Sequence, residues 1–87
     1  MKAPRNNIVG PQVMRIRNDK NMSQADLAVA CQLIGWDVSR GVIARIEGRL
    51  KWVSDSELLQ LARALKVSVP ELFPTNTQRW FKPSKEG

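Results

Sequence analysis

A serine flanked by apolar residues recurs four times in the 87-residue chain, and this repeat restricts the fold more than any other feature of the sequence. The four serines are Ser23, Ser39, Ser54 and Ser68. In this setting a serine caps the free backbone amide of the third helical residue, and the apolar residues on either side form a hydrophobic staple. Each serine therefore predicts the first turn of a helix.

One of the four copies differs from the others at the residue three places after the serine. It is an acid in three copies, Asp26, Glu57 and Glu71, as a capping box and the helix dipole favour. In the copy at Ser39 the position holds Val42. A carboxylate there would repel an approaching phosphate, so its absence favours an anion-binding helix end. Val42 also fits the apolar stripe that a helix buries in its core, and the position by itself does not choose between the two.

These starts and the spacing of apolar residues predict five helices, and we expect an all-α fold. The expected ranges are Pro11–Lys20, Gln24 to about Gly35, Arg40–Glu47, Asp55–Lys66 and Val69–Phe73. No segment alternates apolar and polar residues for long enough to predict a strand. After the second helix, Gly35 is expected in the left-handed conformation, with Trp36 folding back over Cys31. A helix, a tight turn and a short capped helix make a helix-turn-helix.

Composition excludes several classes of function. The chain has one cysteine and no histidine, which excludes an intramolecular disulfide, an ordinary zinc site and histidine-based triads. The carboxylates gather at helix caps, so no catalytic pair is found and we expect neither an enzyme nor a cofactor. The longest apolar run, Leu27–Cys31, is too short to span a membrane, and a cytoplasmic location is expected. Cys31 is expected to be an inert core thiol, and Trp36 and Trp52 to cover the small core.

The charge balance gives a positive indication. The net charge is +6, with five basic residues against one acid in residues 1–22 and four against one in residues 39–52. A small basic domain usually binds a polyanion, and nucleic acid and an anionic membrane surface are the candidates by charge alone.

Taken together, the motifs resemble the phage repressor/Cro-type helix-turn-helix family. The matching stretches are Val9-Gly10 with Val13, Ile16 and Arg17, then Met22-Ser23-Gln24 with Leu27-Ala28, then Val38-Ser39-Arg40 with Ile43, Arg45, Ile46 and Glu47, and finally Leu58-Leu59 through Leu65, Val67-Ser68 and Glu71-Leu72-Phe73. The resemblance implies a five-helix lambda-repressor-like domain at residues 9–73. A basic N-terminal arm (1–8) and a basic C-terminal tail (74–87) would flank it.

The sequence departs from the family pattern at two places. The segment from Ser23 to Ser39 is about five residues longer than usual, which lengthens the second helix by roughly a turn or enlarges the turn after it. Arg49 stands where the family often has a glycine. The first departure affects the angle between the second and third helices.

The resemblance implies a sequence-specific regulator, in the first place a repressor, that inserts the helix at residues 40–47 into the major groove of double-stranded DNA. It places DNA contacts at Gln24, Arg40, Gly41, Val42 and Arg45. Ser39, which caps the same helix, and Arg49 and Lys51, just past its end, complete the candidate DNA-binding residues. Arg40 and Arg45 can each present a guanidinium fork to guanine or bind phosphates, and Val42 can meet a thymine methyl. Gly41 lets the helix backbone approach closely.

Several of these assignments have a plain structural alternative. Arg45 could pair with a neighbouring acid, and Gln24 could be a solvated residue of the first turn. Arg49 and Lys51 are expected to be exposed, either on phosphates or in a solvated loop. By the same resemblance, Arg17 pairs with Glu47 in a structural ion pair.

We expect a homodimer, because one recognition helix reads too few base pairs to be selective in a genome. The residues expected to form its contact are Leu72, Phe73, Trp80 and Phe81. Leu72 and Phe73 could instead close the core of the monomer, and Trp80 and Phe81 could dock on their own domain. The antitoxin of a toxin–antitoxin pair and a protein-interaction module on the same scaffold are the alternative functions.

Overall fold

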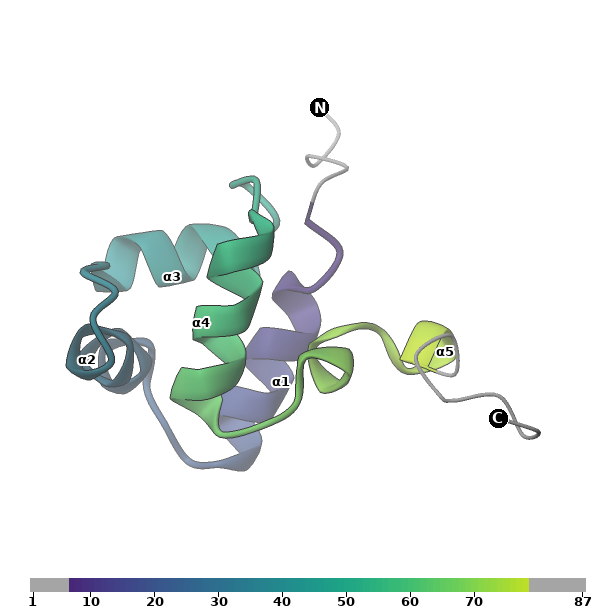
Figure 1. The fold of residues 1–87 in the computed structure, drawn as a ribbon, viewed down its shortest axis with the longest axis horizontal. Helices are drawn as coiled ribbons and strands as arrows, with labels where there is room; N and C mark the ends of the chain where they lie inside the picture. The colour runs from purple at the N-terminus through teal and green to yellow at the C-terminus, as the bar shows by residue number, and fades with distance from the viewer. Residues whose placement is uncertain (1–6, 79–87) are drawn as a thin grey trace.

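The computed structural model describes residues 7–78, and within this range the chain forms helices and no strand. The elements are α1 (Gly10–Asp19), α2 (Gln24–Leu33), α3 (Arg40–Glu47), α4 (Asp55–Leu65), a 3-10 turn η1 (Val69–Leu72) and α5 (Thr75–Gln78). Helix α2 packs on α3 and α4, and α1 packs on α3 (Figure 1). The predicted all-α class is confirmed.

Three of the four serines cap their helices as the sequence predicts. In each, the serine Oγ accepts a hydrogen bond from the backbone amide three residues on. These bonds join Ser23 to Asp26 (2.9 Å), Ser39 to Val42 (3.2 Å) and Ser54 to Glu57 (3.2 Å). Ser68 differs, because its amide and its hydroxyl both donate to the Glu71 carboxylate at 2.7 Å. The helix that follows Ser68 is accordingly a short 3-10 turn rather than an α-helix.

The turn between α2 and α3 closes as expected around Gly35, whose φ of +99° lies in the left-handed region. The Trp36 amide donates to the Cys31 carbonyl at 2.9 Å, and the Gly35 amide donates to the Gln32 carbonyl at 3.0 Å. This pair of bonds is the Schellman arrangement. Helix α2 ends at Leu33, two residues before the predicted end near Gly35. The Gln32 side chain ties the end of this helix to the Val38 carbonyl at 2.8 Å.

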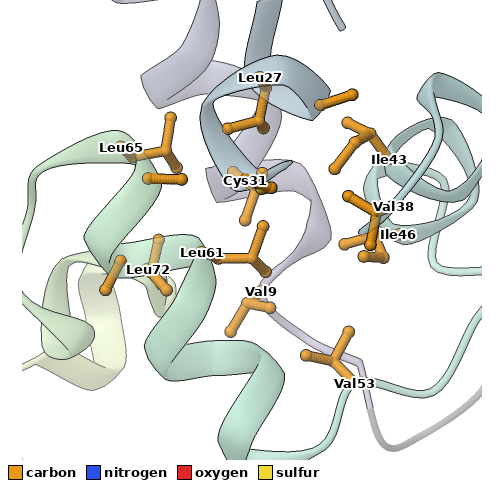
Figure 2. Packing of buried hydrophobic residues seen from close by; sticks show 14 residues of the cluster. Val9, Leu27, Cys31, Val38, Ile43, Ile46, Val53, Leu61, Leu65 and Leu72 are labelled. Carbon is orange, nitrogen blue, oxygen red and sulfur yellow. The ribbon is translucent and has the colours of Figure 1, made fainter. Parts of the chain in front are cut away.

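The apolar core lies between α1, α2, α3 and α4 (Figure 2). Cys31 is fully buried there, and burial raises the pKa of its thiol to about 11, which confirms an unreactive core thiol. Trp36 is half-buried against the core as expected. Trp52 is 57% exposed, so the expectation that it covers the core is wrong. The neighbouring Val53, which precedes the cap of α4, takes the inward position instead.

The C-terminal part departs from expectation at three points. The fifth predicted helix, Val69–Phe73, is the four-residue η1, and α5 lies in the segment predicted to be a tail. Leu72 is completely buried in the core, so the expectation that it contributes to a dimer contact is wrong. Phe73 is half-buried against the same core. Trp80 and Phe81 lie outside the described residues.

Candidate DNA-binding surface

One side of α3 presents polar residues to solvent along the length of the helix. Arg40, Gly41 and Arg45 are exposed, as is the capping Ser39, while Val42 is half-buried against the core. The first turn of α3 contains no acid. Arg45 makes no ion pair with any residue between 7 and 78, so the described part of the chain offers no partner for the structural alternative.

A buried ion pair fixes the other end of α3. Arg17 Nε donates to Glu47 Oε2 at 2.7 Å and Arg17 Nη2 donates to Glu47 Oε1 at 3.0 Å, with the two side chains 9% and 3% exposed. The hydrogen bond to Glu47 raises the pKa of Arg17. The same guanidinium donates to the Met22 carbonyl at 2.7 Å. The predicted Arg17–Glu47 pair is confirmed, and it joins α1, the start of α2 and the end of α3.

Gln24, at the start of α2, connects this ion pair to the exposed side of α3. Its Nε2 donates to Glu47 Oε1 at 3.0 Å, and its Oε1 accepts from Arg40 Nη1 at 3.5 Å. The side chain is therefore half-buried and bonded rather than a freely solvated polar residue. The amide nitrogen and the amide oxygen of Gln24 each have a protein partner, so this side chain links Glu47 to Arg40.

Two residues that support α3 have no assigned role in the sequence analysis. Asn7 is 1% exposed, and its Nδ2 donates to the carbonyls of Ile46 (2.8 Å) and Lys51 (3.0 Å). Its Oδ1 accepts from the Gly10 amide at 2.9 Å. A Cβ at Gly10 would lie 2.2 Å from the Ile46 carbonyl oxygen, so only glycine allows this approach of α1 to α3.

No local pattern marks Asn7 as a buried residue. The residue directly before α1 is Val9, which forms no side-chain cap. The buried position of Asn7 arises from contacts with residues 39 and 44 positions away in the chain.

The loop after α3 is less exposed than the sequence predicts. Arg49 and Lys51 are both half-buried, because the loop folds back on the domain. Arg49 has a φ of +59°, which explains why glycine is common here in the family, and its Nε donates to the Asn7 carbonyl at 2.6 Å. Lys51 Nζ pairs with the Glu57 carboxylate at 3.2 Å. The expected full exposure of these two residues is wrong.

Comparison with known proteins identifies this arrangement. The helix-turn-helix family model matches residues 13–72, which is more than half of the chain. The chain belongs to the helix-turn-helix family. The predicted resemblance is thereby confirmed, and this helix-turn-helix protein is a DNA-binding transcription regulator.

Three solved structures are similar to the helix-turn-helix protein. The restriction-modification controller protein C.AhdI from Aeromonas hydrophila has 29% identity and a TM-score of 0.66, over 75% of this chain and 87% of that one. The clp gene regulator ClgR from C. glutamicum has 27% identity and a TM-score of 0.68, over 82% and 86%. A hypothetical transcription factor from Neisseria, NHTF, shares the fold at 20% identity and a TM-score of 0.70, over 92% and 91%. Curated proteins gave no match.

Among residues 7–78, no three cysteine or acidic side chains gather in a way that could hold a metal ion. None of the helices there has the length and apolar character needed to cross a membrane.

Proposed function

We propose that the protein is a repressor that binds operator DNA as a homodimer and places α3 in the major groove. The observation that carries this proposal is the contrast along α3. Its solvent-facing side exposes Arg40 in the first turn and Arg45 in the last, and its first turn has no acid, while Glu47 at its end is fixed by a buried ion pair. A helix held at its end by a buried ion pair, with exposed cations on one side, meets the need of base readout, because the donors must be held in a defined register.

The roles within α3 follow from exposure and chemistry. Arg40 and Arg45 donate to guanine O6 and N7, since each can form two parallel hydrogen bonds with that edge. Val42 contacts a thymine methyl. Gly41 brings the backbone close to the DNA, and a Cβ there would meet no protein atom nearer than the Ser39 Oγ at 3.6 Å. The space beside Gly41 is therefore open to a partner.

The remaining contacts set the register of the protein on the duplex. Gln24 and Ser39, at the starts of α2 and α3, lie on the phosphate backbone. Arg49 and Lys51 bind phosphates at the far end of α3. Only the Nε of Arg49 has a hydrogen-bond partner among the described residues, which leaves its two terminal nitrogens for DNA. The Lys51 ammonium is paired with the Glu57 carboxylate, so we expect Lys51 to contribute less to phosphate binding than Arg49 does.

A dimer supplies the selectivity that one helix lacks. Two copies related by a dyad read half-sites about 34 Å apart, one turn of the duplex. The similarity to a restriction-modification controller and to a gene regulator supports the regulatory role. The protein is of prokaryotic or phage origin and acts in the cytoplasm, in association with the nucleoid.

The experiment that tests the proposal is selection of bound duplexes from a random DNA library, followed by affinity measurements at several salt concentrations. We expect a palindromic consensus, a specific Kd at least 1,000-fold below that for random duplex, and a steep salt dependence. Recovery of no consensus, with salt-independent or absent binding, would contradict the proposal and leave the protein-interaction module. Co-purification with a small toxic protein would identify an antitoxin.

A further inference from the structure

A cleft opens at the N-terminal end of α1, where three segments far apart in the sequence meet. Its volume is about 440 Å³, which lies in the range of small-molecule sites. Three apolar side chains, a glutamine and two arginines line it, namely Ile8, Pro11, Pro74, Gln12, Arg15 and Arg49. Ile8 is 42% exposed, although the residues on either side of it are buried. We refer to this hollow as the α1 cleft.

The α1 cleft has a positive character. Its only charged lining residues are Arg15 and Arg49. The Arg15 Nε lies 4.0 Å from the Asp19 carboxylate with both side chains exposed, and such an ion pair is weak. The first turn of α1 contains no acid, so the positive end of the helix dipole adds to the arginines. A neighbouring cleft that shares Arg15 differs, because Asp19 and Glu71 both line it. Of the two clefts, the α1 cleft is the one that suits an anion.

The Arg49 guanidinium is held in place by the segment before α1. Its Nε donates to the Asn7 carbonyl at 2.6 Å, and no residue between 7 and 78 forms a hydrogen bond or ion pair with its two terminal nitrogens. Asn7 is itself fixed by hydrogen bonds to the carbonyls of Ile46 and Lys51. One nitrogen thus positions the guanidinium and the other two remain for a ligand. A guanidinium fixed in this way can bind a carboxylate through two parallel hydrogen bonds with little loss of rotamer entropy.

We propose that the α1 cleft binds a small organic anion, made of an apolar body the size of one ring and a single carboxylate. The carboxylate binds the terminal nitrogens of Arg49, and the charge of Arg15 adds to the attraction. The body lies against the apolar side chains of the cleft, Ile8, Pro11 and Pro74, and leaves water when it does so.

The regulatory consequence rests on the proposed function, in which the same nitrogens of Arg49 bind a DNA phosphate. The carboxylate and the phosphate then compete for one guanidinium. The ligand weakens operator binding, and operator binding weakens ligand binding by the same factor. The ligand is therefore an inducer that releases the repressor from its operator.

The first test uses phenylacetate as the probe and the full-length protein without DNA. Amide chemical shifts in NMR spectra locate the site, and a titration gives the Kd. We expect shift changes at Ile8, Gln12 and Arg49 and a Kd on the order of 1 mM, as suits a ligand of this size. Phenylacetamide lacks the charge, and acetate and inorganic phosphate lack the apolar body. Each of these three controls should bind at least five-fold more weakly.

A matched pair of arginine variants tests the α1 cleft itself. Arg15 and Arg63 are both exposed, and each donates to a glutamine three residues earlier, Gln12 at 3.4 Å and Gln60 at 3.0 Å. Arg15→Gln should raise the Kd for phenylacetate at least five-fold, whereas Arg63→Gln should leave it within about two-fold of the wild type. Without the probe, both variants should bind the operator as the wild type does. Thermal unfolding checks that each variant keeps the fold.

The second test adds a single operator half-site. Saturating phenylacetate should raise the Kd of the wild type for this duplex at least five-fold. It should also flatten the dependence of log K on log salt by about 0.9, the slope of one phosphate contact. Acetate at the same concentration controls for ionic strength and should have neither effect.

Four results would overturn the inference. Unchanged amide shifts in the free protein would exclude a site in the α1 cleft. Equal binding of acetate or inorganic phosphate would make it a general anion site. At least ten-fold tighter binding of phenylacetate by the full-length variant Trp80→Ser with Phe81→Ser would assign the α1 cleft to the C-terminal segment. Bound phenylacetate without effect on operator binding would exclude the inducer.

The two proposals fail in different ways, because the site is measured without DNA. Shift changes at the α1 cleft in a protein that binds no operator would support the ligand site and contradict the proposed function. Specific operator binding by a protein whose amide shifts do not respond to phenylacetate would contradict the ligand site alone.

Discussion

The two ends of α3 are built in opposite ways. At its N-terminal end Arg40 is exposed, the first turn has no acid and Gly41 has open space beside it. At its C-terminal end the side chains of Asn7, Arg17 and Glu47 are buried and fully bonded. One eight-residue helix thus has a free end and a fixed end. The residues that hold α3 in place are therefore different from the residues that α3 exposes to a partner.

The largest expected effect comes from breaking the fixed end. Glu47→Ala leaves the Arg17 guanidinium buried without its carboxylate, and we expect a loss of about 3–5 kcal/mol in the free energy of unfolding, measured by urea denaturation. The double variant Arg17→Met with Glu47→Leu removes both charges and should lose much less. A loss below about 1 kcal/mol for Glu47→Ala would show that this end is not held by the ion pair.

A second change tests the close approach at the same end. In Gly10→Ala the new Cβ would overlap the Ile46 carbonyl oxygen, so α1 must move away from α3, and we expect a cost of about 1–3 kcal/mol in unfolding free energy. Gly41→Ala is the matched glycine at the free end. Equal stability of the two alanine variants would mean that the two ends do not differ in packing.

On the exposed side of α3, substitution should affect binding rather than folding. Arg40→Ala and Arg45→Ala should each weaken binding to the best operator by about 1–3 kcal/mol and relax preference at one base pair. Their unfolding free energies should stay within about 0.5 kcal/mol of the wild type, since both side chains are exposed. Equal weakening on all sequences would make that arginine a phosphate contact. Competition binding with single-base operator variants distinguishes the two outcomes.

In Gly41→Ala we expect the stability of the fold to rise and the affinity for the operator to fall. Alanine in the first turn of α3 should stabilise the free protein by about 0.5–1 kcal/mol, because glycine loses more backbone entropy on folding. The added methyl should weaken operator binding if the backbone lies against DNA. Thermal unfolding and fluorescence anisotropy measure the two effects. Unchanged affinity would move this residue away from the duplex.

The smallest effects are expected in the loop that joins the fixed end to α4. Arg49→Ala and Lys51→Ala should each flatten the dependence of log K on log salt by about 0.9, with even weakening across sequences. Because both residues are half-buried, each variant needs its own unfolding curve as a control. An unchanged slope in both variants would place this loop away from DNA.

The free end of α3 was largely predictable from the sequence. Serine caps, the missing acid at Val42 and the turn at Gly35 are determined by residues within a few positions of one another, and the structure has each of them where the pattern predicts. The Arg17–Glu47 pair was predicted from family resemblance rather than from the residues themselves. Whether the exposed residues contact DNA stays a prediction.

The sequence by itself determined where the helices begin, because a cap needs only the amides and side chains of one turn. Only the tertiary structure decided which residues fix α3 and which surface is left for a partner. Asn7 is buried because the fold brings Ile46 and Lys51 to it. Leu72 is buried because η1, which contains it, packs against α4 and α1. Trp52 is exposed because the neighbouring Val53 occupies the inward position. Burial depends on what the rest of the chain places around a residue, and local pattern carries no information about neighbours 40 positions away.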